Sequence, residues 1–409
     1  EEIMKKILSI ALVALLAASA FAGFTGSANV DFGFNLDTKE WGFANGTSLT
    51  VSGDLSTASV DQKAEGDIYA GIKASYTLGF GLEKQKSGFE VTDPTGMGLK
   101  FTGSISEAYI TDGNWTLSIL GANAATNYAI SAIDKDSEGK FYDFGVPYVK
   151  APGVAFSMAG YKASLGLWGK GSDEVKTSVT FETPAYELAE GFTLGAAANY
   201  AFQKDATATT ANGVGASVKT AYENDTFSLA VASDIGYDIV AEKFGADVAA
   251  KFSVTPVVVD FYYATFAKTA NDTTGIENLL SAQVTTDLTA FEVPLQLTVA
   301  GKDLINKQNL SAKVVAPIDP VTITVYGGYV IQDEDWNVGG SVAYTHDLFT
   351  AEAGVEVSKG VSLTANASIS STALVPGATL KLAWYDANED MDLLNEKYGK
   401  IAASCSIAF

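Results

Sequence analysis

The densest group of potential metal ligands in the sequence is an acidic stretch near the carboxyl end, residues 386–397 (DANEDMDLLNEK). Four of its residues repeat the spacing of the first four ligand positions of a calcium-binding loop: Asp386, Asn388, Asp390 and Asp392. The match ends there, because Met391 replaces the glycine required by the turn of such a loop and Lys397 replaces its bidentate glutamate. We therefore predict a solvated acidic loop, and we retain these four residues only as a weak candidate metal site.

Catalytic chemistry has little to build on in this chain. His346 is the one histidine, so no site can use two imidazoles, and a Ser-His-Asp centre would have to use this residue, which stands at a predicted short turn. Cys405 is the one cysteine, which excludes an intramolecular disulfide and a thiolate metal cluster. Glycine-rich pieces such as Gly79–Gly81 precede no helix and are not phosphate loops. We predict that the protein is not an enzyme and uses no cofactor.

Composition narrows the class further. The 409 residues include 48 Asp and Glu against 26 Lys and no Arg, which gives a formal net charge of −22. Such a charge disfavours nucleic acid as a partner, because binding to phosphates needs a basic surface. Hydrophobic residues make up 47% of the chain and charged residues 18%, a balance that argues against disorder.

The first segment resembles an export signal. Residues 4–22 (MKKILSIALVALLAASAFA) combine two lysines, a short apolar run and small residues that end in an A-x-A site. The apolar run is shorter than the ~20 residues of a spanning helix. We predict that residues 1–22 are an amino-terminal extension and a secretory signal peptide cleaved after Ala22, and that residues 23–409 form one domain.

Alternation of apolar and polar residues fills the rest of the chain. Ala28 to Leu36 alternate in this way, as do Ile68 to Phe80, and further runs begin near Val214, Phe291 and Leu380. Many runs reach ten or more residues, which exceeds the ~5–6 residues of an ordinary strand and matches the ~9–11 residues of a tilted membrane-crossing strand. We predict an all-β protein, a single transmembrane antiparallel up-and-down β-barrel of about 20 strands, with roughly 16 to 22 allowed.

The connections between these runs support a barrel. From residue 200 onward, longer polar connections such as Gln203–Gly213 roughly alternate with short ones such as Thr255–Pro256. Outer-membrane barrels have short periplasmic turns and longer outer loops. Aromatic residues fall near predicted strand ends, where interfacial girdles are expected: Trp115, Trp168, Tyr222, Tyr237, Trp336, Tyr344, Trp384 and Tyr398.

The carboxyl-terminal strand is typical of outer-membrane barrels. Apolar residues stand at every second position and the last residue is aromatic: Ile401, Ala403, Cys405, Ile407 and Phe409. This pattern resembles the terminal signal that delivers such proteins to the outer-membrane barrel assembly machinery. Cys405 shares the parity of the apolar set, so we expect its thiol to face lipid.

Parity also predicts which charged residues point into the barrel. Charges facing lipid would cost roughly 2–4 kcal/mol for a lysine near the midplane, so charged residues opposite the apolar set are assigned to the lumen. The pore-lining candidates are Asp67, Lys73, Lys219, Asp247, Lys251, Asp260, Lys313, Glu352, Glu356 and Lys381. Both signs occur, so they either set the ion preference of an open pore or pair with each other and fill the lumen. A barrel of this size favours the open pore.

Three stretches resemble the major outer sheath protein family of treponemal spirochaetes. They are Leu36–Phe43 (LDTKEWGF), Gly66–Ala70 (GDIYA) and Phe244–Ala264 (FGADVAAKFSVTPVVVDFYYA). The resemblance implies an abundant, trimeric outer-membrane porin that also adheres to host matrix proteins. It implies no catalytic residues. Some descriptions of that family include a separate amino-terminal periplasmic region, whereas alternation begins here by Ala28.

Three functions fit these observations. The first is an outer-membrane porin for passive diffusion of small hydrophilic solutes and ions. The second is a surface adhesin or structural outer sheath protein that uses the barrel as a platform, for which the acidic loop 386–397 is the natural contact region. The third is a substrate-specific channel, which an aromatic track in the lumen would favour. The sequence favours the first.

Overall fold

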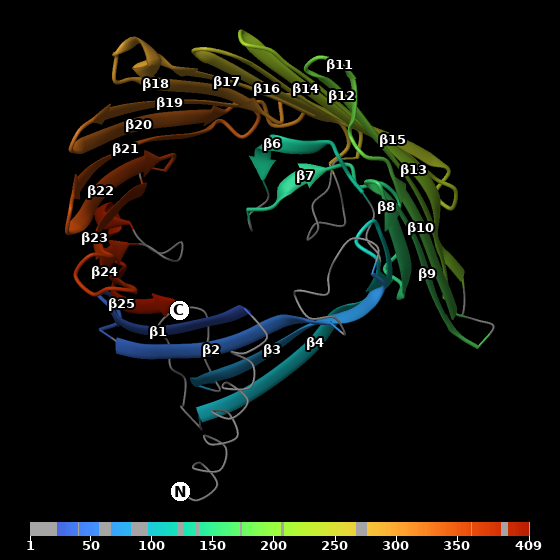
Figure 1. Cartoon of the computed structure of the whole chain (residues 1–409). Coiled ribbons are helices and arrows are strands. Elements are labelled where there is room, and N and C mark those ends of the chain that lie inside the picture. The colour runs from blue at the N-terminus through green and yellow to red at the C-terminus, as the bar shows by residue number, and fades with distance from the viewer. Residues whose placement is uncertain are drawn as a thin grey trace, which may run out of the picture.

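The computed structural model describes residues 23–39, 41–56, 67–82, 97–120, 126–135, 139–171, 174–205, 208–266, 276–360, 362–385 and 392–408. Most of these residues lie in β-strands (Figure 1). Within this part of the chain, no helix is both long and apolar enough to cross a membrane.

One antiparallel sheet contains 23 strands. The first group is β1 (Gly23–Asn35), β2 (Trp41–Ser56), β3 (Tyr69–Leu82), β4 (Met97–Thr111), β5 (Trp115–Leu120), β8 (Gly153–Met158) and β9 (Tyr161–Lys170). The second is β10 (Glu174–Glu182), β11 (Tyr186–Ala189), β12 (Phe192–Asp205), β13 (Ala208–Glu223), β14 (Phe227–Asp238), β15 (Lys243–Val254), β16 (Val257–Ala264) and β17 (Leu279–Asp287). The third is β18 (Gln296–Lys302), β19 (Asn309–Ile318), β20 (Val321–Val330), β21 (Asp335–His346), β22 (Phe349–Ser358), β23 (Ser362–Ser371), β24 (Ala378–Tyr385) and β25 (Lys400–Ala408).

The sheet closes on itself. Each wall strand except β10 pairs with the next wall strand along the chain, and β25 pairs with β1 from Ser27 opposite Ala408 to Asn35 opposite Lys400. Because β10 and β11 both lie along β12, the wall has 22 strand positions, at the upper end of the predicted range. The predicted single antiparallel up-and-down barrel is confirmed.

Alternation gives the wall two different faces. Large apolar side chains are exposed on the outside, such as Ile105 (61% exposed), Ile119 (64%) and Val338 (57%). The residues between them point inward and are small, polar or charged. Strands with this alternation form a barrel because closure pairs the N–H and C=O groups that an open sheet would leave at its two edges.

The two ends of the barrel differ in their connections. At one end, β15 and β16 are joined by Thr255-Pro256 and β19 and β20 by Asp319-Pro320. The opposite end carries several of the longest connections, including residues 121–152 between β5 and β8 and residues 386–399 between β24 and β25. The predicted alternation of short and long connections is therefore present, although not at every hairpin.

Three sequence predictions about the wall were wrong. Phe291 does not begin a strand, because Asp287 caps a short 3-10 helix, η2 (Leu288–Phe291), and β18 starts only at Gln296. The stretch Gln203–Gly213 is not a long loop, since β12 and β13 continue through it as far as Asp205 opposite Ala208. Trp168 is not part of an outer aromatic girdle, because its register partner Lys176 and its parity place it on the inner face.

One segment leaves the wall and folds inward. Residues 126–135 and 139–152, here called the inward segment, include the small strands β6 (Ile130–Lys135) and β7 (Phe141–Asp143), which pair with each other rather than with the wall. Figure 1 shows β6 and β7 inside the ring, beside the wall formed by β12 to β16. This segment positions the candidate functional site.

Candidate functional site

A belt of buried polar side chains holds the inward segment against the wall. Six neighbouring strands, β12 to β17, each contribute one inward residue: Asn199, Ser217, Asp234, Asp247, Tyr262 and Ser281. We call these six residues the polar belt. An irregular backbone inside a barrel needs partners for its N–H and C=O groups, and buried groups left unpaired are costly. The polar belt supplies such partners.

Asp234 binds the first turn of the inward segment. Its carboxylate accepts hydrogen bonds from the backbone nitrogens of Tyr128, at 3.0 Å, and Ala129, at 2.8 Å. Nearby, the Ser217 hydroxyl donates to the carbonyl oxygen of Thr126. The Asn199 side chain accepts a hydrogen bond from the backbone nitrogen of Thr126 and donates one to its carbonyl oxygen. Four backbone groups of the segment thus find partners on three adjacent strands.

Asp247 binds the returning part of the segment. Its Oδ2 accepts from the backbone nitrogen of Phe144 at 2.9 Å and from the Tyr262 hydroxyl at 3.1 Å, and its Oδ1 accepts from the backbone nitrogen of Asp234 at 3.3 Å. Asp234 and Asp247 are directly opposite each other on β14 and β15, and both are fully buried. Buried carboxylates are tolerated when several N–H and O–H groups bind them, as here.

Four inward glycines form a flat bed under the same returning part. A side-chain carbon at Gly213, Gly215 or Gly236 would lie 2.8 Å from Pro147, Val146 or Phe144 respectively. A side-chain carbon at Gly245 would lie closer still to the Phe144 ring. Real side chains do not tolerate such distances, so glycine at these positions allows residues 144–147 to lie directly on the strands.

The far end of β6 reaches β17. The carboxyl group of Asp134 is buried, and burial raises its pKa, although hydrogen bonds from Ser281 and Ser131 partly offset that effect. Beside it, Tyr142 packs against a small apolar cluster of Tyr262, Ala264 and Leu279. The segment is therefore fixed at both ends and in the middle, from β12 to β17.

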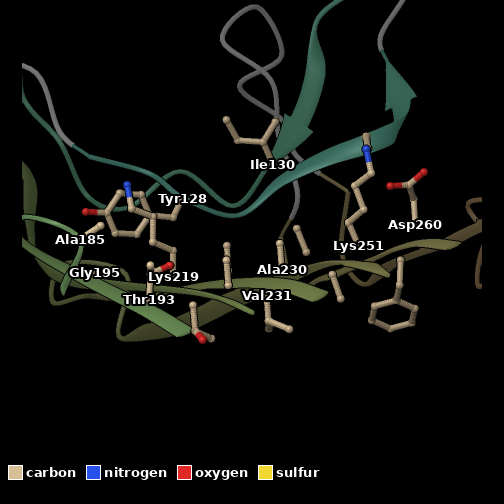
Figure 2. A pocket seen from close by; sticks show the side chains of 17 residues that line it. Tyr128, Ile130, Ala185, Thr193, Gly195, Lys219, Ala230, Val231, Lys251 and Asp260 are labelled. Atoms are coloured by element: carbon tan, nitrogen blue, oxygen red, sulfur yellow. The ribbon is translucent and has the colours of Figure 1, made fainter. Parts of the chain in front are cut away.

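A cavity of about 370 Å³ lies between the segment and the wall. Figure 2 shows Tyr128 and Ile130 on one side of it, with Lys219 and Lys251 rising from the wall on the other. The Lys219 ammonium lies 4.1 Å from the centre of the Tyr128 ring, within range of a cation–π interaction. Burial and the neighbouring Glu182 carboxylate raise the pKa of Tyr128 to about 12, so its hydroxyl stays protonated and donates to Glu182.

Four of the predicted pore-lining residues gather around the inward segment. Lys219, Lys251 and Asp260 line the cavity. Asp247 also points inward, but it is fully buried beneath the segment and binds backbone rather than solvent.

Five others lie on inner faces away from the segment. Lys313, Glu352 and Lys381 are exposed, and each alternates with outward apolar neighbours. Glu356 accepts a hydrogen bond from the Tyr326 hydroxyl at 2.8 Å. Lys73 forms an ion pair of 2.6 Å with Glu107 on the adjacent strand. The tenth residue, Asp67, is exposed and precedes β3, so it lies at the rim rather than along the wall.

The weak metal site gains no support. Asp386, Asn388 and Asp390 lie outside the described residues. Asp392 is described, and its carboxylate is occupied by the backbone nitrogens of Leu363 and Leu394 and the amide of Asn395. The described residues contain no cluster of three or more His, Cys, Asp or Glu able to hold a metal ion.

The structure describes only part of the predicted amino-terminal and carboxyl-terminal signals. Residues 1–22 and Phe409 lie outside the described residues. The other residues of the carboxyl-terminal pattern, Ile401, Ala403, Cys405 and Ile407, all lie in β25, where Ile401 and Ile407 are exposed. Cys405 is a free, half-buried thiol between Val30 and Leu380, and its lipid-facing orientation stays a prediction.

Sequence reasoning missed the inward segment and most of the belt. Asn199, Ser217 and Asp234 have the same parity as the predicted lumen residues and no local feature that separates buried from exposed positions. Two signals were available. Residues 121–152 contain no sustained alternation, and inward glycines recur on three consecutive strands, at Gly213, Gly215, Gly236 and Gly245.

Comparisons with known proteins give fold-level similarity only. No family model matches the chain, and no curated protein matches it. Among solved structures, it is similar to Acinetobacter baumannii OccAB4 (10% identity, TM-score 0.40, 95% of this chain and 98% of that one). It is also similar to Pseudomonas aeruginosa OccK5 (9%, 0.41, 95% and 98%) and to a mutant of the Rh. blastica porin (9%, 0.33, 95% and 100%).

Proposed function

We propose that this chain is an outer-membrane porin, through which small hydrophilic solutes and ions diffuse passively. The observation that carries the proposal is a closed ring of strands with an apolar outside and a polar inside, in which the inward segment lies against β12 to β17 and reaches only their neighbours, Glu182 of β10 and β18. On β19 to β25, charged side chains such as Lys313, Glu352 and Lys381 are exposed on the inner face.

The outer face supports placement in a membrane. Exposed aliphatic and aromatic side chains run around the wall, from Phe32 on β1 to Ile401 on β25. In water, an apolar surface of that extent would drive aggregation, whereas in lipid it is at low cost. A closed barrel leaves no unpaired backbone edge, which is what the hydrocarbon region requires. We place the end with short turns in the periplasm and the end bearing the inward segment outside.

In this proposal the inward segment narrows the passage. Its backbone donates hydrogen bonds to the buried carboxylates of Asp234 and Asp247, and residues 144–147 pack closely on the inward glycines. The segment therefore keeps its position while solutes pass. Narrowing one side of a wide barrel sets a size limit for solutes and brings them close to Lys219, Lys251 and Asp260.

Planar-bilayer recording of the refolded protein tests the proposal. Discrete, long-lived conductance steps in potassium chloride are the expected result, and liposomes containing the protein should swell in small sugars but not in large ones. Correctly folded protein that inserts into bilayers without any conductance steps would refute a porin function.

Several finer statements belong to the same proposal. We infer export through cleavage after Ala22, insertion by the outer-membrane barrel assembly machinery, a homotrimer and membership of the spirochaete outer sheath family. Three sequence stretches and the terminal strand pattern support these inferences. Adhesion to host matrix proteins is the alternative use of the barrel, and comparing matrix binding before and after removal of residues 386–397 tests it.

A further inference from the structure

The cavity under the inward segment has an apolar floor, with Lys219 on one side and the pair Lys251 and Asp260 on the other. Inward alanines from two adjacent strands, Ala230, Ala232 and Ala249, line its floor, and Ile130 and Ala132 of β6 also line it. Figure 2 shows Ala230 on the wall and Ile130 on β6 across the cavity from it. Ala132 and Ala230 are exposed, and Ile130 is 46% exposed, so the cavity is open to the lumen.

Small residues here contrast with the charged inward residues elsewhere on the wall. A cavity of about 370 Å³ is at the lower end of the ~300–1,000 Å³ range of small-molecule sites. It therefore has room for a single aromatic ring together with a charged substituent, since a cavity of about 150 Å³ already holds benzene. Water in such an apolar slot has few partners, so an apolar group that displaces it gains free energy.

Two ammonium groups stand at the sides of this floor. Lys219 is opposite Ala232, and Lys251 is opposite Ala230 on the intervening strand. Strand spacing and rise place their Cα atoms about 12 Å apart. Lys251 is directly opposite Asp260, whereas the two cross-strand partners of Lys219 are Gly195 and Ala232. The lining thus carries two positive charges and one negative charge.

We propose that this cavity binds small organic anions with a compact apolar body, of the aromatic monocarboxylate class, as they pass through the channel. The ring would lie on the alanine floor beneath Ile130, and the carboxylate would bind the Lys219 ammonium. A cation of the same shape is repelled by the Lys219 ammonium, which has no carboxylate opposite it on either neighbouring strand, and a neutral analogue loses the charge-assisted hydrogen bond. The inference depends on the proposed porin function and names a solute class for it.

Block of single-channel current by benzoate is the test. Benzoate added to the bilayer chamber is expected to interrupt the current in a saturable way, with benzyl alcohol and benzylamine at least about fivefold weaker. Phenylalanine is a zwitterion with the same ring, and its block is expected to be weaker than that of benzoate and stronger than that of benzyl alcohol and benzylamine. Equal block by all four probes, or none by benzoate, would overturn the proposal.

Variants connect any block to this cavity. Lys219→Gln is expected to weaken benzoate block about fivefold, and Ala249→Leu to abolish it by filling the floor. Lys381→Gln, a lysine on an inner face far from the cavity, is the matched control and should leave the block unchanged. If Lys381→Gln weakens the block as much as Lys219→Gln, binding is diffuse and the cavity is not a site.

The two proposals fail separately. Conductance in potassium chloride alone tests the porin function, so a conducting channel that ignores benzoate disproves only the binding site. Calorimetric titration of the detergent-solubilised protein with benzoate makes the same comparison of variants without any conduction.

Discussion

The inner face of the barrel is built in two ways. On β12 to β17 it is lined by glycine and alanine and by buried groups such as Asp234 and Asp247, because protein backbone lies on it. On β19 to β25 it carries exposed Lys313, Glu352 and Lys381, because it faces solvent. We call these regions the covered half and the open half. Strands with the same alternation of apolar and polar residues form both regions. Their inward residues differ because one region packs against protein backbone and the other faces solvent.

A carboxylate has different roles in the two regions. In the covered half, the buried Asp234 carboxylate stabilises the fold because it accepts hydrogen bonds from two backbone N–H groups that are shielded from water. In the open half, a carboxylate such as Glu352 is hydrated and contributes mainly to the field in the lumen. Substitutions in the two halves should therefore differ in both size and kind of effect.

Removing the inward segment is expected to give the largest change. Replacement of residues 126–150 by a short Gly-Ser linker should raise single-channel conductance by roughly a factor of two or more, since the segment occupies part of the cross-section. Size exclusion in liposome swelling should shift to larger sugars. Unchanged conductance in a variant that still inserts would show that the covered half does not limit flow.

Crowding the glycine bed should have the next largest effect. Gly236→Val adds carbons where Phe144 and Pro147 now lie 2.8 Å from a side-chain position. The expected loss of stability is about 3 kcal/mol in urea unfolding in detergent, the upper end of the range for overpacking. Gly169→Val is the matched control, because the nearest atom to its side-chain position is 3.6 Å away. Equal losses of stability in the two variants would contradict the inference that residues 144–147 pack directly on the inward glycines.

Removing one belt carboxylate should loosen only part of the segment. Asp234→Ala leaves the backbone nitrogens of Tyr128 and Ala129 without their acceptor, at a cost of about 2 kcal/mol. Hydrogen exchange should accelerate at these two amides, while Asp234→Asn, which retains one carbonyl oxygen, gives an intermediate rate. Glu352→Ala in the open half is the comparison and should leave both amides protected.

Charge removal in the open half should have the smallest effect on stability. Lys313→Gln lies on an exposed inner position, so a change within about 0.5 kcal/mol is expected. Its effect appears instead in selectivity, as a reversal-potential shift of a few millivolts toward cations under a salt gradient. A loss of stability comparable to that of Asp234→Ala would erase the distinction between the halves.

The open half was predictable from the sequence because its pattern is local. Alternation assigns each residue to a face, and the inward assignment of Lys313 or Lys381 needs no knowledge of other strands. A single apolar residue such as Phe291 can still mislead, as it did where Asp287 caps a turn and delays β18.

The covered half was not predictable because its pattern depends on distant pairs. Asp234 has the parity of a lumen residue and nothing nearby in the sequence marks it as buried, because its partners Tyr128 and Ala129 are more than 100 residues earlier in the chain. The inward segment has no periodicity of its own, since its backbone groups are satisfied by side chains of the wall. Only the glycines that recur on neighbouring inward positions could have indicated that something lies on them.

The closure between β1 and β25 also constrains how this molecule is made. The Asp37 carboxylate accepts from the backbone nitrogens of Tyr398 and Gly399, which follow it by 361 and 362 residues. One edge of β1 therefore stays unpaired until β25 has been synthesised. Contacts this distant in sequence make folding slow, and an unpaired edge invites aggregation during the delay. Assembly thus depends on protection of the unfinished sheet for the whole of that interval.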